Sequence, residues 1–178
     1  PFLLGAVELV QTIQQAEMPI CFPAIAPCKE RALQVEDSYN LHLLLSQLRT
    51  GKPVATTIVK NPIDFAVGGE VHILTGPNQG GKTVYAQTIG LNQLLFQAGL
   101  PIAGRSARLS PADQVMTHYQ VEERPDAQVG RLGEEALRLK HIFEQLTPRS
   151  LLLFNESFSS TNMYESIYLA KDILQVLG

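Results

Sequence analysis

The residue types best suited to chemistry occur together in the glycine-rich stretch GPNQGGKT at 76–83. The stretch fits the pattern G-x-x-x-x-G-K-[ST], in which glycines allow successive backbone N–H groups to turn toward a phosphate. In that pattern the Lys82 ammonium can reach the β- and γ-phosphates, and the Thr83 hydroxyl can ligate Mg²⁺. A dinucleotide-binding loop has a different glycine spacing and lacks the Lys-Thr pair. We therefore predict a nucleotide site formed by Gly76, Pro77, Asn78, Gln79, Gly80, Gly81, Lys82, Thr83 and Val84.

A second group of chemically capable residues ends the apolar stretch LLLFNE at 151–156. A nucleotide hydrolase needs a group that holds the metal's water and a base for the attacking water, both close to the phosphates. We assign the base to Glu156, which would polarise water for attack on the γ-phosphate, and we take Lys82 as the second catalytic residue. Asn155 would act in the metal site through a Mg²⁺-bound water, with an amide oxygen that brings no charge. The alternative is that Glu156 only caps a surface turn.

These groups need a scaffold that brings strand ends and a helix start together. EVHILT (70–75) predicts a strand that runs directly into Gly76, and the helical pattern that follows the loop ends near Gly99. SLLLF (150–154) is short and continuously apolar, as expected for a buried parallel strand. The other predicted elements are helices over 2–17, 82–99, 132–146 and 164–177, and short strands over 32–35, over 54–59 and within 106–121. This alternation favours an α/β fold with a mostly parallel sheet.

Composition limits the classes of function. The chain has 178 residues and 45% apolar content, which suit one domain or one domain with an appendage. Its net charge of −3 gives no overall electrostatic footprint for nucleic acid, so we expect any DNA contact to lie in other segments. Neither a membrane-spanning stretch nor a signal peptide is recognisable, and we expect a cytoplasmic protein without a membrane partner. Cys21 and Cys28 are interpreted as reduced structural cysteines, with a disulfide or redox role as the alternative.

Four stretches together resemble the ATPase domain of the MutS family of DNA mismatch repair proteins, also called domain V. They are GPNQGGKT (76–83), SPADQV (110–115), GRLGEE (130–135) and LLLFNESFSSTN (151–162). The segment from FPAI to RALQVEDSYN, residues 22–40, also resembles the start of that domain. The resemblance covers roughly 22–178.

The resemblance implies a fold and a domain organisation. The expected fold is a P-loop NTPase of the ABC-ATPase type, with a mostly parallel sheet flanked by helices and a small antiparallel strand region. Residues 1–21 would be a leading helix and linker from a preceding core or lever domain. Residues 22–178 would be the ABC-type ATPase domain, truncated at its C-terminus.

The resemblance also implies ATP and Mg²⁺ as cofactors, and two ATPase domains that face each other in a homodimer or with a related subunit. Each composite site would combine the phosphate loop of one chain with a signature segment of the other, here Gly130, Gly133 and Glu135. The family has a serine where this chain has Gly130, so backbone N–H groups at the helix start would have to bind the partner's γ-phosphate. GRLGEE could instead be a simple helix start. A turn that would cross the dimer interface, or be an ordinary turn, comprises Ser159, Ser160, Thr161 and Asn162.

Two further departures from the family concern hydrolysis. The family normally has aspartate where this chain has Asn155, and the amide implies weaker metal affinity without loss of the fold. The family class also has a γ-phosphate-sensing histidine after the last helix. The four histidines here come too early for that role and are interpreted as structural or exposed; they are His42, His72, His118 and His141.

The leading hypothesis is therefore the ATPase module of a MutS-like DNA repair protein, possibly a divergent branch. It would couple ATP binding and hydrolysis at a dimer interface to DNA-binding domains outside this chain. The first alternative is a weakly hydrolysing or non-hydrolysing nucleotide switch of a MutS-related protein that does not act in mismatch repair. A transporter subunit is less favoured because GRLGEE lacks the serine-glycine-glycine signature, and a small-molecule kinase because no acceptor site is recognisable.

Overall fold

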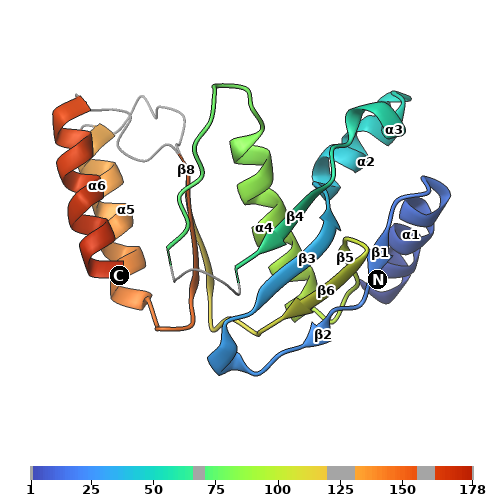
Figure 1. The fold of residues 1–178 in the computed structure, drawn as a ribbon, viewed down its shortest axis with the longest axis horizontal. Coiled ribbons are helices and arrows are strands. Elements are labelled where there is room, and N and C mark those ends of the chain that lie inside the picture. The colour runs from blue at the N-terminus through green and yellow to red at the C-terminus, as the bar shows by residue number, and fades with distance from the viewer. Residues whose placement is uncertain (1, 66–70, 120–130, 156–162, 178) are drawn as a thin grey trace. The chain divides into compact units, whose positions relative to one another are not determined.

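The computed structural model describes residues 2–65, 71–119, 131–155 and 163–177 (Figure 1). Two compact units make up the chain. The first unit comprises Pro1–Gly68 with Leu74–Ala112, and the second comprises Gly69–Ile73 with Asp113–Gly178.

The first unit is built on a four-stranded sheet in the order β2-β6-β3-β4. Its central strand β3 is antiparallel to both neighbours, whereas β2 and β6 are parallel. A separate antiparallel pair joins β1 to β5. The strands are β1 (Ile20–Cys21), β2 (Ala24–Ile25), β3 (Leu33–Ser38), β4 (Asn61–Asp64), β5 (Ile102–Ala103) and β6 (Ser106–Leu109).

The helices of the first unit are α1 (Phe2–Gln15), α2 (Leu41–Thr50), α3 (Val54–Thr57) and α4 (Lys82–Gln97), with a short 3-10 helix η1 (Cys28–Glu30). Local chemistry sets both ends of α2. Its N-cap is Asn40, whose side-chain oxygen accepts a hydrogen bond from the Leu43 N–H at 2.8 Å. Its C-cap is Gly51 at φ 66°, a left-handed conformation that glycine adopts without steric cost.

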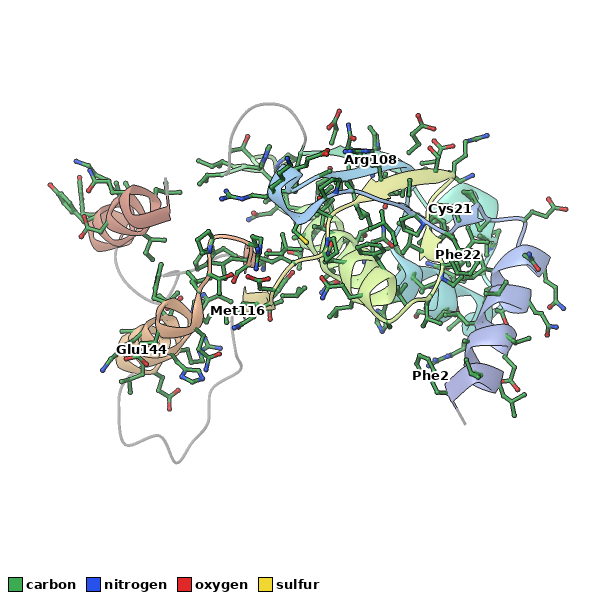
Figure 2. All side chains as sticks on the ribbon, turned by 90° about the horizontal axis from the view of Figure 1, so that it is seen from below. Phe2, Cys21, Phe22, Arg108, Met116 and Glu144 are labelled. Carbon is green, nitrogen blue, oxygen red and sulfur yellow. The ribbon has the colours of Figure 1, made fainter. Side chains whose placement is uncertain are left out.

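The four-stranded sheet has one buried and one exposed face. Alternate residues of β3, β4 and β6 are buried on the face toward α4; they are Leu33, Val35, Ile63 and Leu109. The other face is polar and carries side-chain pairs such as Gln34 with Asp64 and Arg108 with Glu30. Figure 2 shows Arg108 on the side of the sheet away from α4.

A second apolar cluster joins α1, α2 and the β1–β5 pair. Its buried members are Ile13, Met18, Tyr39, Leu41, Leu44, Ile58 and Ala103. Tyr39 is 1% exposed, and burial raises the pKa of its hydroxyl. The beginning of α1 is different, because Phe2, Leu3 and Leu4 are 63%, 76% and 65% exposed. The cluster therefore holds the C-terminal half of α1 in place, through Ile13.

The second unit contains a two-stranded parallel sheet and two helices. Strands β7 (Val115–Tyr119) and β8 (Leu151–Asn155) pair in register from Val115 with Leu151 to Tyr119 with Asn155. The helices are α5 (Arg131–Gln145) and α6 (Met163–Leu177). Asp113 fastens the start of this sheet, because its carboxylate accepts hydrogen bonds from the Arg149 guanidinium and the Thr147 hydroxyl. These bonds hold the pKa of Asp113 below its usual value.

The predicted fold class is wrong. We expected a mostly parallel sheet of the P-loop, ABC-ATPase type, but the main sheet is mixed and mostly antiparallel. Among the strands that the structure describes, only β2–β6 and β7–β8 are parallel pairs. Strand order depends on long-range pairing, which hydrophobic periodicity does not encode.

Two predicted strands are also wrong. Residues 71–75 form no strand in the described chain, and Ile73 and Leu74 are 71% and 51% exposed. Residues 54–57 form helix α3 instead of the strand expected over 54–59. The Thr57 hydroxyl donates to the Pro53 carbonyl at 2.6 Å, a local bond that closes one helical turn and outweighs the β propensity of Val54 and its neighbours.

No described helix combines the length and the apolar character that crossing a membrane requires.

Candidate functional site

The predicted nucleotide-binding residues form an exposed loop that leads into the first turn of α4. The Gly80 N–H donates to the Pro77 carbonyl at 3.1 Å and closes a tight turn. Gly81, at φ 85° and ψ 8°, is the N-cap of α4 and makes no side-chain cap hydrogen bond. The first N–H groups of α4 therefore face the loop without the capping oxygen that Asn40 supplies to α2.

The turn leaves no room for a side chain at Gly80. An added Cβ would lie 2.9 Å from the Pro77 carbonyl oxygen and 3.3 Å from Pro77 Cγ. The backbone would have to shift to accept it. Position 80 therefore requires glycine for this turn.

Lys82 closes the loop from the helix side. Its Nζ donates to the carbonyl oxygens of Gly76 at 2.9 Å and Pro77 at 2.8 Å. The ammonium therefore lies across the loop, where it holds two carbonyl groups that would otherwise repel an anion. Thr83 follows it, half-buried, in the first turn of α4.

Buried polar side chains hold α4 on the sheet, and our sequence reasoning missed them. Asn92 is 2% exposed; its Nδ2 donates to Ser38 Oγ at 2.9 Å and its Oδ1 accepts from the Ala103 N–H at 3.2 Å. Gln93, also 2% exposed, donates from Nε2 to the Ser110 carbonyl at 3.0 Å. The only sequence signal is that both amides occupy the helix face that hydrophobic residues normally fill.

Two more contacts hold the first turn of α4, next to the loop. The Tyr85 hydroxyl donates to the Pro62 carbonyl at 2.9 Å, which links α4 to β4. The Asn40 Nδ2 donates to the Val84 carbonyl at 3.0 Å, which links α4 to the start of α2. Neither Tyr85 nor Asn40 was predicted as a site residue.

The remaining predicted residues belong to the second unit or lie outside the described residues. Glu156, Gly130 and the interface turn of Ser159, Ser160, Thr161 and Asn162 lie outside the described residues. Asn155 is the last residue of β8 and is half-buried. Gly133 and Glu135 lie on α5, where Glu135 is 8% exposed. Their assignment to a metal site and a partner site stays a prediction.

Glu135 lies close to the buried His118 of β7, which is 1% exposed. The His118 ring packs against Phe154 of β8, with ring centroids 5.6 Å apart. Burial and the nearby Arg138 guanidinium lower the pKa of His118, and the Glu135 carboxylate and backbone oppose that shift. Arg138 Nη1 also donates to the Tyr119 carbonyl at 3.3 Å. Helix α5 therefore contacts β7 through Glu135 at His118 and through Arg138 at Tyr119.

A depression of about 450 Å³ lies over this junction of α5 and β7. Its lining residues are Thr117, His118, Leu137, Arg138, His141 and Ile142.

Within the described ranges, no group of three or more His, Cys, Asp or Glu residues is placed to hold a metal ion. The two cysteines are free, with Cys21 half-buried and Cys28 exposed, and burial raises the pKa of the Cys21 thiol.

Comparison with known proteins places the loop inside a family domain. The family model described as MutS domain V matches residues 72–178, which is more than half of the chain and includes the whole of 76–83.

Curated relatives agree with this match. The protein named Endonuclease MutS2 from Lactococcus lactis subsp. lactis is 34% identical over 124 residues, which cover 69% of this chain and 16% of the relative. The protein of the same name from Streptococcus equi subsp. equi is 28% identical over 183 aligned residues, 99% of this chain and 21% of the relative. That from Lacticaseibacillus casei is 34% identical over 122 residues, 68% of this chain and 16% of the relative. The chain thus spans about a sixth to a fifth of the length of the curated relatives it matches.

Proposed function

Because the chain belongs to the MutS family, we propose that it is the ATP-binding module of a MutS-like DNA repair protein. The observation that carries the proposal is the loop at 76–83, which combines the family match with a geometry suited to phosphate. Gly80 has no space for a Cβ, and α4 begins without a side-chain cap. The positive N-terminal end of α4 lies at this loop and favours an anion there.

The residues of the loop have distinct roles in this proposal. The backbone from Gly76 to Gly81 wraps the phosphates, and the N-terminal turn of α4 adds its positive end. Lys82, already directed across the loop toward the Gly76 and Pro77 carbonyls, turns its ammonium to the β- and γ-phosphates. Thr83 would hold Mg²⁺ through its hydroxyl. The metal ion would supply charge neutralisation between the β- and γ-phosphates.

Hydrolysis would need residues from more of the chain and from a second ATPase module. Glu156 would orient and deprotonate the attacking water, and Asn155 would hold a metal-bound water through its amide oxygen. The partner chain, a second copy or a related subunit, would contribute backbone N–H groups around Gly130 and Gly133. ATP binding would thereby favour the association of two modules.

Work on DNA would fall to other parts of the parent protein. The net charge of −3 makes a non-specific phosphate-backbone contact by this chain unfavourable. The nuclease activity in the relatives' names belongs to proteins of which the chain covers 16% and 21%.

A second candidate function is a nucleotide switch with weak hydrolysis. Asn155, the last residue of β8, favours it, because an amide would hold a metal-bound water without contributing charge. In that case ATP acts mainly by shifting a conformational equilibrium.

One set of variants tests the proposal. Lys82→Ala should eliminate binding of ATP–Mg²⁺ measured by calorimetry, while the surface variant Lys140→Ala should bind like the wild type. Unchanged affinity in Lys82→Ala would overturn the site. Robust turnover that Glu156→Ala abolishes would exclude the switch, whereas tight binding without turnover would favour it.

A further inference from the structure

We propose that Asn40 is a positioning residue for the nucleotide-binding loop and that it couples phosphate binding at 76–83 to the packing of α2. The proposal rests on the function proposed above. Asn40 is 4% exposed, and both ends of its amide are used. Oδ1 accepts from the Leu43 N–H at 2.8 Å, and Nδ2 donates to the Val84 carbonyl at 3.0 Å.

The Val84 carbonyl belongs to the turn that carries the phosphate-binding side chains. Lys82 and Thr83 directly precede it in α4. The same carbonyl also accepts the Thr88 hydroxyl at 2.8 Å, but that bond lies within α4 and links it to no other element. A displacement of this turn on phosphate binding would therefore stretch or shorten the bond to Asn40.

The other end of the link is rigid. Asn40 is the N-cap of α2, and the first turn of α2 is anchored by Leu41 and Leu44, which are 7% and 0% exposed. Both leucines belong to the apolar cluster that also contains Ile13 of α1 and Tyr39. A closely packed cluster has low compressibility, so it transmits a displacement from one side chain to the next. The amide thus joins the phosphate loop to the α1–α2 core.

The residue type supports a role beyond capping. Aspartate and serine cap helices about as well as asparagine, but they lack its pair of donor and acceptor atoms. An ionised aspartate has no hydrogen to donate, and serine has one hydroxyl oxygen in place of the two amide atoms that Asn40 uses for Leu43 and Val84. Asn92 and Gln93 already hold the rest of α4, and Tyr85 ties its first turn to β4 through an exposed hydroxyl bond. Asn40 supplies the buried tie from that turn to α2.

The experiment distinguishes the effect of the Asn40–Val84 hydrogen bond on nucleotide affinity from the effect of α2 stability. Asn40→Asp and Asn40→Ser keep the cap of α2 and remove the donor to Val84. Gly51→Ala strains the opposite end of α2, where φ is +66°, without touching α4. Thr88→Val removes a different donor from the same carbonyl and leaves the link to α2 intact.

Affinity for ATP–Mg²⁺ is measured by calorimetry for each variant, together with its thermal unfolding. We expect both Asn40 variants to lose about three- to tenfold in affinity, the scale of one hydrogen bond. Gly51→Ala should lower the melting temperature yet keep wild-type affinity, and Thr88→Val should also keep it. Hydrogen exchange of the Leu43 amide should slow on addition of nucleotide in the wild type and not in Asn40→Ser.

Two results would overturn the proposal. Asn40 variants that bind as tightly as Gly51→Ala show that the residue is only a cap, and unchanged exchange at Leu43 in nucleotide-bound wild type shows that the sites are not coupled. A wild-type chain that does not bind ATP–Mg²⁺ at all is a distinct outcome, because it removes the proposed function and this inference with it.

Discussion

The Gly80 N–H donates to the Pro77 carbonyl oxygen at 3.1 Å, and a Cβ on Gly80 would lie only 2.9 Å from that same oxygen. The turn closed by this hydrogen bond therefore requires a residue without a side chain at position 80. The turn exists in this form because position 80 is glycine.

Gly80→Ala should open this turn and weaken ATP–Mg²⁺ binding by about five- to thirtyfold, the effect of losing about 1–2 kcal/mol of preorganisation. Calorimetric titration measures the loss. The control is Gly5→Ala in α1, where nothing lies within 4 Å of the added Cβ. That variant should keep its affinity and gain about 0.5–1 kcal/mol of stability, because alanine is the better helix former.

Asn92→Ala should destabilise the chain by about 2–4 kcal/mol, because it leaves buried groups on β3 and β5 without their amide partner. These are the Ser38 hydroxyl and the backbone of Ala103. Urea unfolding followed by circular dichroism gives the free energy. Leu94→Ala changes a 54% exposed residue of the same helix and should change stability by less than about 0.5 kcal/mol. Equal effects of the two variants would contradict the anchoring role of Asn92.

His118 should make stability depend on pH. Burial and Arg138 hold its pKa below the ordinary 6.5, so between the two values the unfolded chain binds a proton that the folded chain does not. The free energy of unfolding should therefore be highest above pH 6.5 and fall as the pH drops below it. His118→Leu should flatten this decline, measured by unfolding at pH 7 and pH 5. His42→Gln, at an exposed position, should leave the decline unchanged.

Asn155→Asp should restore a charge at the end of β8 and lower the Mg²⁺ concentration needed for half-maximal ATP turnover. The backbone pairing of Asn155 with Tyr119 does not involve the side chain, so the fold should persist. Turnover measured against Mg²⁺ concentration tests this. Gln11→Glu changes the charge of α1 equally and should have no effect on the metal dependence. An identical Mg²⁺ dependence in Asn155→Asp would remove Asn155 from the metal site.

Four helices, α1, α4, α5 and α6, were predictable because their signals are local, whereas α2 was not predicted and α3 was predicted as a strand. The patterns over 2–17 and 82–99 correspond to α1 at Phe2–Gln15 and α4 at Lys82–Gln97, and these predictions are confirmed. Glycine and proline after each pattern mark where backbone hydrogen bonding must stop. The parallel strand predicted at 150–154 is also confirmed, as β8 paired with β7.

Sheet topology was not predictable from the same patterns. Whether β3 pairs with β6 and β4, and in which direction, depends on residues that are far apart in the chain, such as Leu33 and Leu109. The apolar residues of 71–75 show most directly that a hydrophobic pattern alone does not determine a strand. Their composition predicts a buried strand, but composition cannot supply the neighbouring strand that would bury it.

The candidate site likewise contains residues that local sequence spacing identifies and residues that only the tertiary fold identifies. The glycines, Lys82 and Thr83 could be proposed from spacing alone, because the predicted phosphate contacts lie within eight consecutive residues. Asn40, Asn92 and Gln93 could not, because each acts through a partner that the fold brings from elsewhere in the chain. The assigned roles of Glu156, Asn155 and the signature residues stay predictions.

The exposed residues just before the loop have a practical consequence for the protein in solution. Val71, Ile73 and Leu74 are 38%, 71% and 51% exposed in a proline-free segment that forms neither helix nor strand and contains β-branched residues. Such a segment is a template for intermolecular strand addition, and therefore for aggregation. Aggregation should thus increase with protein concentration, and a charged residue in place of Ile73 should reduce it by blocking strand addition.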